Sequence, residues 1–210
     1  RRGGCPVRDD VAAAVAAIRG GGIAVIPTDT VYGLACDPAD EAAVRRLYAL
    51  KGRGEGQPTA VVARDVDALL ALVPELSGPE ELVLRAVLPG PYTLVLPNPA
   101  GRLGWLTGGR AGTIGVRVPH LEGPGRAVVD AVGIVAATSA NLTGGTDPRR
   151  LADVPRVILE GAVVVDGGTL PGTPSTVVDL TGPDPVVLRE GAAPAADAVS
   201  RIGRARTATA

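Results

Sequence analysis

The spacing of apolar residues predicts a helix near the start of the chain. Val11, Val15 and Ile18 are four and three positions apart, so they lie on one face of a helix. Asp10 precedes this stretch as a candidate N-cap, and the glycines at 20–22 end it. Similar apolar stripes predict three further helices, which begin near residues 40, 65 and 80.

Short apolar runs bounded by glycine, proline and polar residues predict eight strands. The chain has no Phe, one Trp and three Tyr, so Val, Leu, Ile and Ala must build its core. A core rich in β-branched side chains favours strands. By residue number, the expected strands are 23–26, 59–63, 92–96, 113–118, 134–137, 162–165, 176–180 and 186–189.

Strands that first alternate with helices and then follow one another closely are typical of an α/β domain with a mixed sheet. We therefore expect a single α/β domain, with a twisted mixed sheet and flanking helices, over residues 8–191. A chain of 210 residues is a common size for one domain. The alanine-rich segment 192–210 has too few large apolar residues for a second domain. We expect it to be a flexible C-terminal tail, either frayed or a loosely packed helix.

Composition excludes several classes of function. A formal net charge of −1 gives no global attraction for nucleic acid or anionic membranes. No run approaches the roughly 20 apolar residues of a spanning helix, and no signal-peptide pattern is present, so we expect a cytoplasmic protein. Cys5, Cys36 and the single His120 have neither metal-ligand spacing nor a nucleophile elbow. Neither a Walker A sequence nor a GxGxxG follows a strand, which disfavours P-loop NTPases and dinucleotide dehydrogenases.

Polar clusters beside the predicted strands suggest an anion site. PTDTVYGL follows the first strand and contains the hydroxyls of Thr28, Thr30 and Tyr32. Lys51 and Arg53 come one helix later, and two cations that converge suit a phosphorylated or nucleotide ligand. Each cluster alone is more typical of a polar turn or a solvated basic pair than of a ligand site. The hypothesis therefore depends on the clusters that follow.

Three later clusters have a similar position. In TIGVRVP, Thr113 and Arg117 are four residues apart on a strand, so both project from one face, and Gly115 between them leaves room for a ligand. The hydroxyls, the amide and the glycine-flanked N–H groups of AATSANLTGG are suited to phosphate. GTPSTVVD is followed by Arg189, a further candidate cation. Because ligands of α/β sheets bind at the carboxyl ends of strands, we expect the clusters to line one pocket.

Six motifs in this order resemble those of the YrdC-like threonylcarbamoyl-AMP synthases. They are PTDTVYGL, KGR, PGPYTLVLP, TIGVRVP, ATSAN and PSTVVDLTG, and the resemblance covers roughly residues 21–191. It implies a twisted YrdC-like α/β fold with a concave basic surface, in a short form without an extra C-terminal domain. It also implies a nucleotidyltransferase that condenses L-threonine, bicarbonate and ATP to threonylcarbamoyl-AMP and pyrophosphate. The product would serve tRNA threonylcarbamoyladenosine modification through separate threonylcarbamoyl-transferase complex proteins, and tRNA is a candidate partner.

The resemblance also implies roles for individual residues. The basic and polar tetrad of the family, implied to be catalytic, falls on Lys51, Arg53, Ser139 and Asn141. The residues implied to bind threonine are Thr30, Tyr32, Arg117, Ala137 and Ser175. Those implied to bind ATP are Lys51, Arg53, Gln57, Thr113, Ser139 and Arg189. Mg²⁺ would accompany ATP, and no protein side chain is assigned to the metal.

The implied chemistry needs no histidine or cysteine nucleophile. The carbamate formed from threonine would attack the α-phosphate of ATP, and cationic side chains with Mg²⁺ would offset the charge on the leaving pyrophosphate. Two alternatives stay open. One is an RNA-binding accessory module of the same fold without synthase activity, and the other is a carbamoyl-adenylate enzyme that acts on another substrate.

Overall fold

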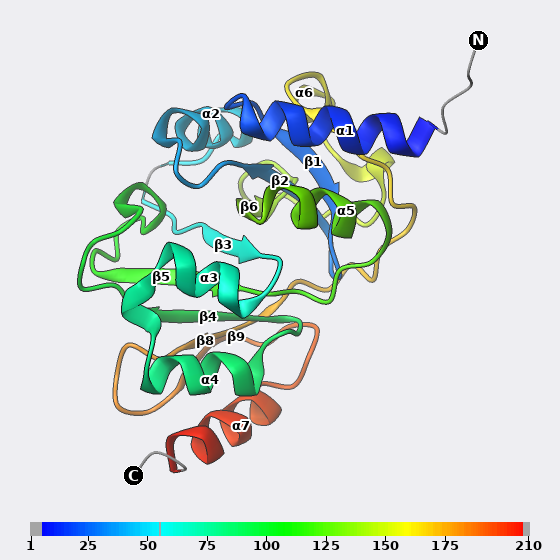
Figure 1. Cartoon of the computed structure of the whole chain (residues 1–210). Helices are drawn as coiled ribbons and strands as arrows, with labels where there is room; N and C mark the ends of the chain where they lie inside the picture. Colours follow the sequence, from blue (N-terminus) through cyan, green and yellow to red (C-terminus); the bar gives the residue numbers. More distant parts are fainter. Residues whose placement is uncertain (1–5, 55, 208–210) are drawn as a thin grey trace.

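The computed structural model describes residues 6–54 and 56–207, which form one nine-stranded sheet and the helices around it (Figure 1). The strands are β1 (Ala24–Pro27), β2 (Tyr32–Cys36), β3 (Ala60–Ala63), β4 (Tyr92–Pro97), β5 (Thr113–Arg117), β6 (Ile134–Ser139), β7 (Val163–Val164), β8 (Thr176–Asp179) and β9 (Val186–Arg189). The α-helices are α1 (Pro6–Arg19), α2 (Glu41–Lys51), α3 (Val66–Leu72), α4 (Pro79–Val87), α5 (Gly123–Val132), α6 (Arg156–Glu160) and α7 (Ala195–Thr207). Short 3₁₀ helices are η1 (Pro74–Leu76), η2 (Gly104–Leu106) and η3 (Leu151–Asp153).

The sheet is mixed, as expected. Its strand order is β7-β1-β2-β6-β3-β5-β4-β8-β9, with parallel pairing of β1 with β7, β3 with β5, and β4 with β8. All eight expected strands are present, with ends that differ from the expected ones by two residues at most. The sequence pattern missed β2, which forms an antiparallel hairpin with β1 in which Pro27 lies opposite Tyr32. It also missed α5, because this helix begins with Gly-Pro-Gly and has no side-chain cap.

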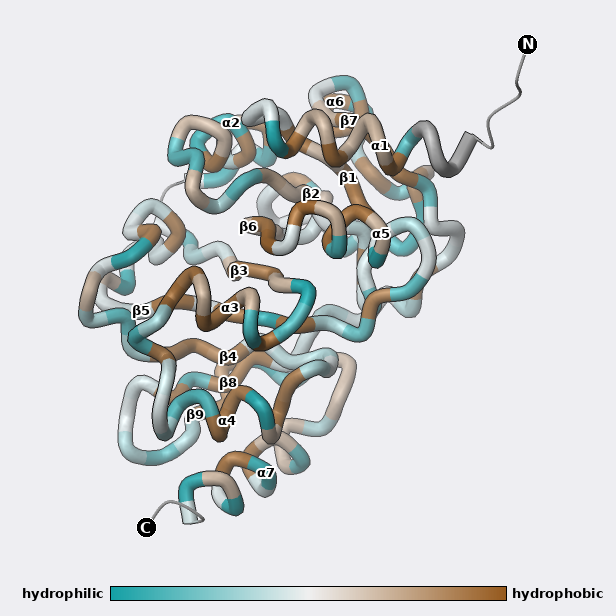
Figure 2. Tube along the Cα trace, in the orientation of Figure 1, coloured by the Kyte–Doolittle hydropathy of each residue, from teal (hydrophilic) through white to brown (hydrophobic). Residues whose placement is uncertain are grey.

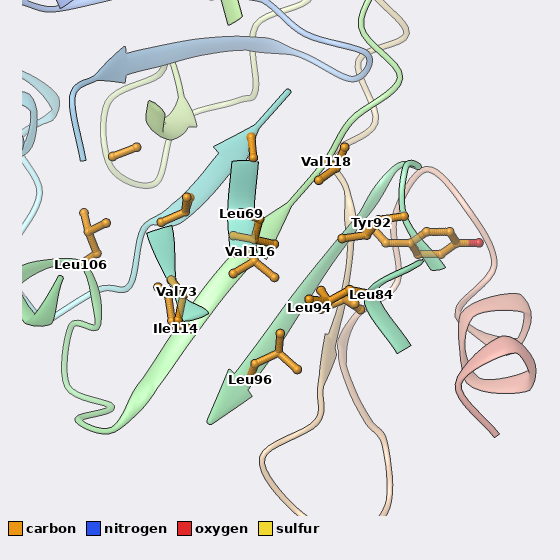
Figure 3. Packing of buried hydrophobic residues seen from close by; sticks show 14 of the residues in the cluster. Leu69, Val73, Leu84, Tyr92, Leu94, Leu96, Leu106, Ile114, Val116 and Val118 are labelled. Carbon is orange, nitrogen blue, oxygen red and sulfur yellow. The ribbon is translucent and has the colours of Figure 1, made fainter. Parts of the chain in front are cut away.

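The larger hydrophobic core lies between one face of the sheet and helices α2, α3, α4 and α7. Figure 3 shows Leu69 of α3 against Val116 of β5, and Leu84 of α4 against Leu94 of β4. All four side chains are fully buried. Burying each one stabilises the fold by about 1.5–3 kcal/mol. Figure 2 shows hydrophobic residues concentrated in β3, β4 and β8, and alternating with hydrophilic ones along α4 and α7.

Helices α1 and α5 cover only half of the opposite face. Ile18 of α1 and Val128 of α5 pack with Ile26 of β1 and Val135 of β6 in a second, smaller core. In the part of the chain that the structure describes, no helix packs on this face over β5, β4, β8 and β9. One half of the sheet is therefore left open on this side.

The two ends of α2 position residues that the sequence singled out. The carboxylate of Asp40 caps the helix by accepting a hydrogen bond from the backbone N–H of Ala43 (3.0 Å). At the other end Gly52 has φ 62°, a left-handed conformation that glycine adopts without steric cost. The helix therefore ends directly after Lys51, and the chain turns so that Arg53 lies in the following loop.

The structure corrects the expectation of a flexible tail at 192–210. Residues 195–207 form α7, which packs against α4 and β8. Ala195, Ala198 and Ile202 are buried, and their spacing of three and four makes an apolar stripe that is narrow because two of its members are small. Residues 208–210 of the expected tail, like Cys5, lie outside the described residues. None of the helices within residues 6–54 and 56–207 combines the length and the apolar run needed to cross a bilayer.

Candidate active site

On the face of the sheet that α1 and α5 cover only in part, strands β2, β6, β3 and β5 form the floor of a cavity of about 450 Å³. Small residues on adjacent strands form this floor, namely Gly33, Ala60, Gly115 and Ala137. Ala60 lies opposite Ala137 across β3 and β6, and a β-carbon at Gly115 would lie 3.6 Å from the Cα of Ala60. Because these side chains are so short, the cavity is deep enough for a ligand to lie along the sheet.

The charge around the cavity is mainly positive. Arg53, Arg110, Arg117 and Arg189 line it, and Asp147 is the one carboxylate among the described lining residues. Arg110 and Arg117 are each ion-paired with a carboxylate of a neighbouring strand or loop. Arg53 and Arg189 have no ion-pair partner among the described residues. This surplus of positive charge favours an anionic ligand.

Lys51 lies behind the cavity wall and holds the segment that follows β6. Its Nζ donates hydrogen bonds to the backbone oxygens of Ser139 (2.5 Å) and Asn141 (2.9 Å), and to Oδ1 of Asn141. The residue is only 5% exposed and is not among the lining residues. Burial, together with repulsion from Arg53, lowers the pKa of Lys51 to about 8. An ammonium has three donors, and here three protein oxygens accept them.

Ser139 and Asn141 continue this network toward the cavity. The hydroxyl of Ser139 donates to Oδ1 of Asn141 (2.7 Å). The amide of Asn141 donates to the backbone oxygen of Gly145 (2.5 Å) and to Oδ1 of Asp147 (3.2 Å). Ser139 and Asp147 line the cavity, whereas Asn141 does not. Lys51 and Asn141 thus support the wall that Ser139 presents.

Arg53 lies at the same wall and faces the cavity. Its guanidinium donates to the hydroxyl of Thr138 (2.8 Å) and to the backbone oxygen of Pro58, and lies 5.7 Å from the ring centroid of Tyr48. The Nε atom is buried and has no hydrogen-bond partner among the residues that the structure describes. Burial lowers the pKa of Arg53, yet the group stays charged because a guanidinium remains protonated in proteins. Arg53 is therefore a cation beside the cavity that has no carboxylate partner within the described part of the chain.

Arg117 and Thr30 form a second polar group on the cavity. Arg117 donates through Nη2 to Oδ1 of Asp29 and to the hydroxyl of Thr30 (3.1 Å). The side chains of Arg117 and Asp29 are 11% and 9% exposed. Burial raises the pKa of Asp29, although the charge of Arg117 opposes this. Oδ2 of Asp29 and Nε of Arg117 are buried and have no partner within residues 6–54 and 56–207, so the pair is held by few contacts.

Ser175 and Arg189 lie at the far side of the cavity. Nε of Arg189 donates to the backbone oxygen of Ser175 (3.0 Å), and Nη2 donates to its hydroxyl (3.2 Å). The hydroxyls of Ser175 and Thr93 are 2.8 Å apart. The charge of Arg189 also contributes to lowering the pKa of Arg117, after burial and against the attraction of Asp29. Arg117 and Arg189 line the same cavity.

The cavity lies across a face of the sheet rather than at the carboxyl ends of its strands. Thr113, Gly115 and Arg117 line it along the whole of β5, whose side chains alternate as expected. Ser175 precedes β8 instead of following it. The expectation of a strand-end pocket was therefore wrong in its geometry, although it grouped most of the residues correctly. Gln57 and Ala137 also line the cavity.

Tyr32 is placed away from the cavity, against the expectation that it contacts a ligand. Its hydroxyl has two acceptors within reach of its single proton, Oδ1 of Asp166 (2.9 Å) and the backbone oxygen of Gly168 (2.8 Å), and accepts from the N–H of Gly167 (2.9 Å). The residue is fully buried, and burial raises its pKa to about 12. Successive residues of a strand face opposite sides of the sheet, and in β2 Gly33 is on the cavity side, so the side chain of Tyr32 points to the other face.

Sequence reasoning missed several lining residues. Asp147 lies six positions after Asn141, the last residue of the motif ATSAN. A single Asp in a turn-rich segment matches no motif, so the sequence did not mark it as a site residue. Thr93 lies in the motif PGPYTLVLP, which gave it no role of its own, but alternation along β4 places its side chain on the cavity face, opposite to the core-facing Leu94. Arg110 belongs to none of the motifs. Only the pairing of the strands shows that these residues lie together.

Comparison with known proteins identifies the family. Residues 16–191 match the family model Sua5_yciO_yrdC, whose description reads "Telomere recombination". The chain is 35% identical over 192 residues to the threonylcarbamoyl-AMP synthase of Pyrococcus abyssi, and this match covers 90% of this chain and 56% of that protein. It is 38% identical over 167 residues to the threonylcarbamoyl-AMP synthase of Thiobacillus denitrificans, which covers 78% of this chain and 87% of that protein.

The fold agrees with the same assignment. The structure superposes on P. abyssi Sua5 complexed with L-threonine with a TM-score of 0.82 and 34% sequence identity. The match covers 92% of this chain and 57% of that one, so this chain spans little more than half the length of the P. abyssi protein. By its sequence motifs, its sheet and these matches, the chain belongs to the Sua5/YciO/YrdC family.

Proposed function

We propose that the protein is an L-threonylcarbamoyladenylate synthase, which condenses L-threonine, bicarbonate and ATP to threonylcarbamoyl-AMP and pyrophosphate. One observation carries the proposal. A single cavity joins a group suited to a carboxylate, Arg117 with Thr30, to Arg53 and Arg189, two cations that form no ion pair with any described residue and suit phosphates. The names of the P. abyssi and T. denitrificans relatives, and the L-threonine complex of the former, support this reading.

Arg117 and Ser175 would hold threonine. A guanidinium recognises a carboxylate through two parallel N–H donors, and Arg117 is fixed in position by Asp29 and Thr30. Ser175 is buried next to Arg189, which brings a hydroxyl close to the amino acid and to the phosphates. Ala137, on the floor of the cavity, would contribute only its backbone because its side chain is a methyl group.

Arg53, Ser139 and Arg189 would bind the phosphates of ATP, with Gln57 and Thr113 along the rest of the nucleotide. Lys51 and Asn141 would act indirectly, since their hydrogen bonds are already made within the protein. This differs from the expectation that Lys51 contacts ATP. Its charge would still stabilise the phosphates from behind the wall, because the buried site screens charges poorly.

The proposed reaction needs no protein nucleophile. The neutral amine of threonine adds to the carbon of CO₂, which bicarbonate supplies by losing hydroxide, and loses a proton to give a carbamate. A carbamate oxygen then attacks the α-phosphorus of ATP, and the bond to the β-phosphate oxygen breaks to release pyrophosphate. Arg53 and Arg189 offset the negative charge that builds on the leaving group, which is the main way a site without a nucleophile accelerates such a step.

Mg²⁺ would enter as part of the ATP substrate. The described residues contain no cluster of three potential metal ligands, and Asp147 is the single lining carboxylate. A magnesium ion usually takes phosphate oxygens, waters and one or two carboxylates. The residues therefore fit a metal that arrives on the phosphates, with Asp147 as its one candidate protein contact. Bound there, the metal would neutralise phosphate charge.

The proposed product would pass to threonylcarbamoyl-transferase complex proteins for tRNA modification, and for that role we propose a cytoplasmic enzyme with tRNA as a candidate partner. The test is pyrophosphate release by the purified protein with MgATP and bicarbonate, with and without L-threonine. Arg53→Ala is expected to lower the threonine-dependent rate at least tenfold, about 1.4 kcal/mol in barrier. Tight, salt-sensitive tRNA binding without turnover would favour an RNA-binding module instead. Turnover only with a different amine would favour a related carbamoyl-adenylate enzyme.

A further inference from the structure

Arg110 lies on the cavity but belongs to none of the motifs of the family. It is in the loop between η2 and β5, and its side chain is 41% exposed. The hydroxyl of Thr113 donates to the backbone oxygen of Arg110 (2.7 Å). Arg110 therefore marks the end of the cavity at which β5 begins.

Close backbone packing fixes the loop that carries Arg110. The N–H of Gly109 donates to the backbone oxygen of Gly56 (3.0 Å), and the N–H of Thr59 donates to that of Leu106 (2.9 Å). Gly108 has φ 60°, and a β-carbon there would lie 2.6 Å from the backbone nitrogen of Pro58. Only glycine permits this approach, which holds Arg110 beside the loop of Gln57.

Asp179 orients the guanidinium of Arg110. Oδ2 of Asp179 accepts from Nη2 of Arg110 (2.5 Å), while Oδ1 accepts from the N–H (2.9 Å) and the hydroxyl (2.7 Å) of Thr181. Burial alone would raise the pKa of Asp179, but the hydrogen bonds from Thr181 and Arg110 outweigh it and lower the pKa. The carboxylate is thus charged at neutral pH, and the pair it forms with Arg110 has no net charge.

This neutrality separates Arg110 from Arg53 and Arg189. Those two cations lack a carboxylate partner among the described residues and attract phosphates. Arg110 contributes little net charge, and the lining residues nearest to it in the chain, Thr107 and Thr113, are uncharged. Such surroundings suit the uncharged part of a nucleotide better than its phosphates.

The length of β5 gives the direction of the ligand. Thr113 and Arg117 are four residues apart, about 13 Å along a strand. With the amino acid at Arg117, an adenylate that lies along the strand has its nucleoside at Thr113 and Arg110. We infer that Arg110, held by Asp179, binds the adenine base of ATP through the planar face of its guanidinium. This inference rests on the proposed function, because that function supplies the nucleotide.

The test compares two ligands by titration calorimetry, ATP and inorganic tripolyphosphate, which lacks the nucleoside. Arg110→Gln and Arg110→Lys are each expected to weaken ATP binding about tenfold, the size of one base stacked on a side chain. Tripolyphosphate binding is expected to change less than twofold. Asp179→Asn, which leaves Arg110 unoriented, should follow the same pattern. The matched control is Arg102→Gln, because Arg102 forms a similar half-exposed ion pair with Glu75 outside the cavity.

Unchanged ATP binding in both Arg110 variants would overturn the inference. So would an equal loss for ATP and tripolyphosphate, since that pattern shows a contact with phosphates. Melting curves identify any variant that fails to fold, and Arg110→Lys, which keeps the charge, then decides. Threonine-dependent pyrophosphate release by the unchanged protein is measured in parallel. If pyrophosphate release depends on threonine but the Arg110 variants bind ATP as the unchanged protein does, only this inference fails. If there is no threonine-dependent release, the proposed function is contradicted.

Discussion

The buried ion pair of Asp29 and Arg117 allows a quantitative prediction. Asp29→Ala removes the carboxylate and leaves the guanidinium of Arg117 with the hydroxyl of Thr30 as its remaining partner. Both side chains of the pair are about a tenth exposed, so water replaces the lost carboxylate only in part. An uncompensated buried charge is much more costly than a broken surface pair.

The expected loss can be worked from this burial. Breaking a buried pair by removing one partner costs about 3–5 kcal/mol. The lower value applies here, because Arg117 lines a cavity that water can enter. For a chain of 210 residues, about 3 kcal/mol lowers the melting temperature by roughly 6–12 °C. Asp130→Ala, which breaks the exposed pair with Arg126, is expected to lower it by less than about 2 °C.

The assay is thermal unfolding of the single variants and of the double variant Asp29→Ala/Arg117→Met. Because the double variant removes the uncompensated charge, it should regain at least half of the stability lost in Asp29→Ala. Asp29→Asn, which keeps the shape, should raise the KM for threonine more than the KM for ATP. A melting temperature of Asp29→Ala within about 2 °C of the unchanged protein would refute the reasoning. So would a double variant that is less stable than Asp29→Ala.

Three further predictions concern other parts of the molecule. Because the pKa of Lys51 in the folded protein is about 8 rather than 10.5, the unfolded chain binds more protons between these values. Stability should therefore rise with pH across this window, and melting curves of Lys51→Met should lack that rise. If α7 is packed, Ile202→Ala should lower the free energy of unfolding in urea by about 2–4 kcal/mol. The exposed control Ser200→Ala should lower it by less than about 0.5 kcal/mol. Equal losses for the two variants would show that the tail is loose. Ser139→Ala should lower the threonine-dependent rate about tenfold or more, and an unchanged rate would place the phosphates elsewhere.

Local pattern predicted the elements of this fold well where polar and apolar positions alternate clearly. The caps at Asp40 and Asp65 and the strand faces of Thr113 and Arg117 were all predictable, because they depend on residues close in the sequence. The mixed sheet followed from the order of the elements. The sequence pattern missed strand β2 because the polar segment PTDT before it is typical of a loop. The strand is buried because it pairs with β1 on one side and β6 on the other, which are distant from each other in the sequence.

The composition of the site was easier to predict than its geometry. Motifs brought Arg53, Ser139, Arg117 and Arg189 together, because each motif carries chemistry that can be recognised locally. They gave no account of the cavity floor, which depends on the pairing of strands distant in sequence. For the same reason the motifs did not predict that Tyr32 points away from the cavity, or that Lys51 donates its hydrogen bonds to the segment at the end of β6 and not to a ligand.

The most direct test of the central claim is the threonine dependence of adenylate formation. Purified protein is mixed with ATP, Mg²⁺ and bicarbonate, and pyrophosphate is followed before and after L-threonine is added, with Arg117→Met as the matched variant. The account predicts pyrophosphate release only after threonine is added, a product with the mass of threonylcarbamoyl-AMP, and at least tenfold slower release by the variant. Release that is absent, or equal with and without threonine, would contradict it.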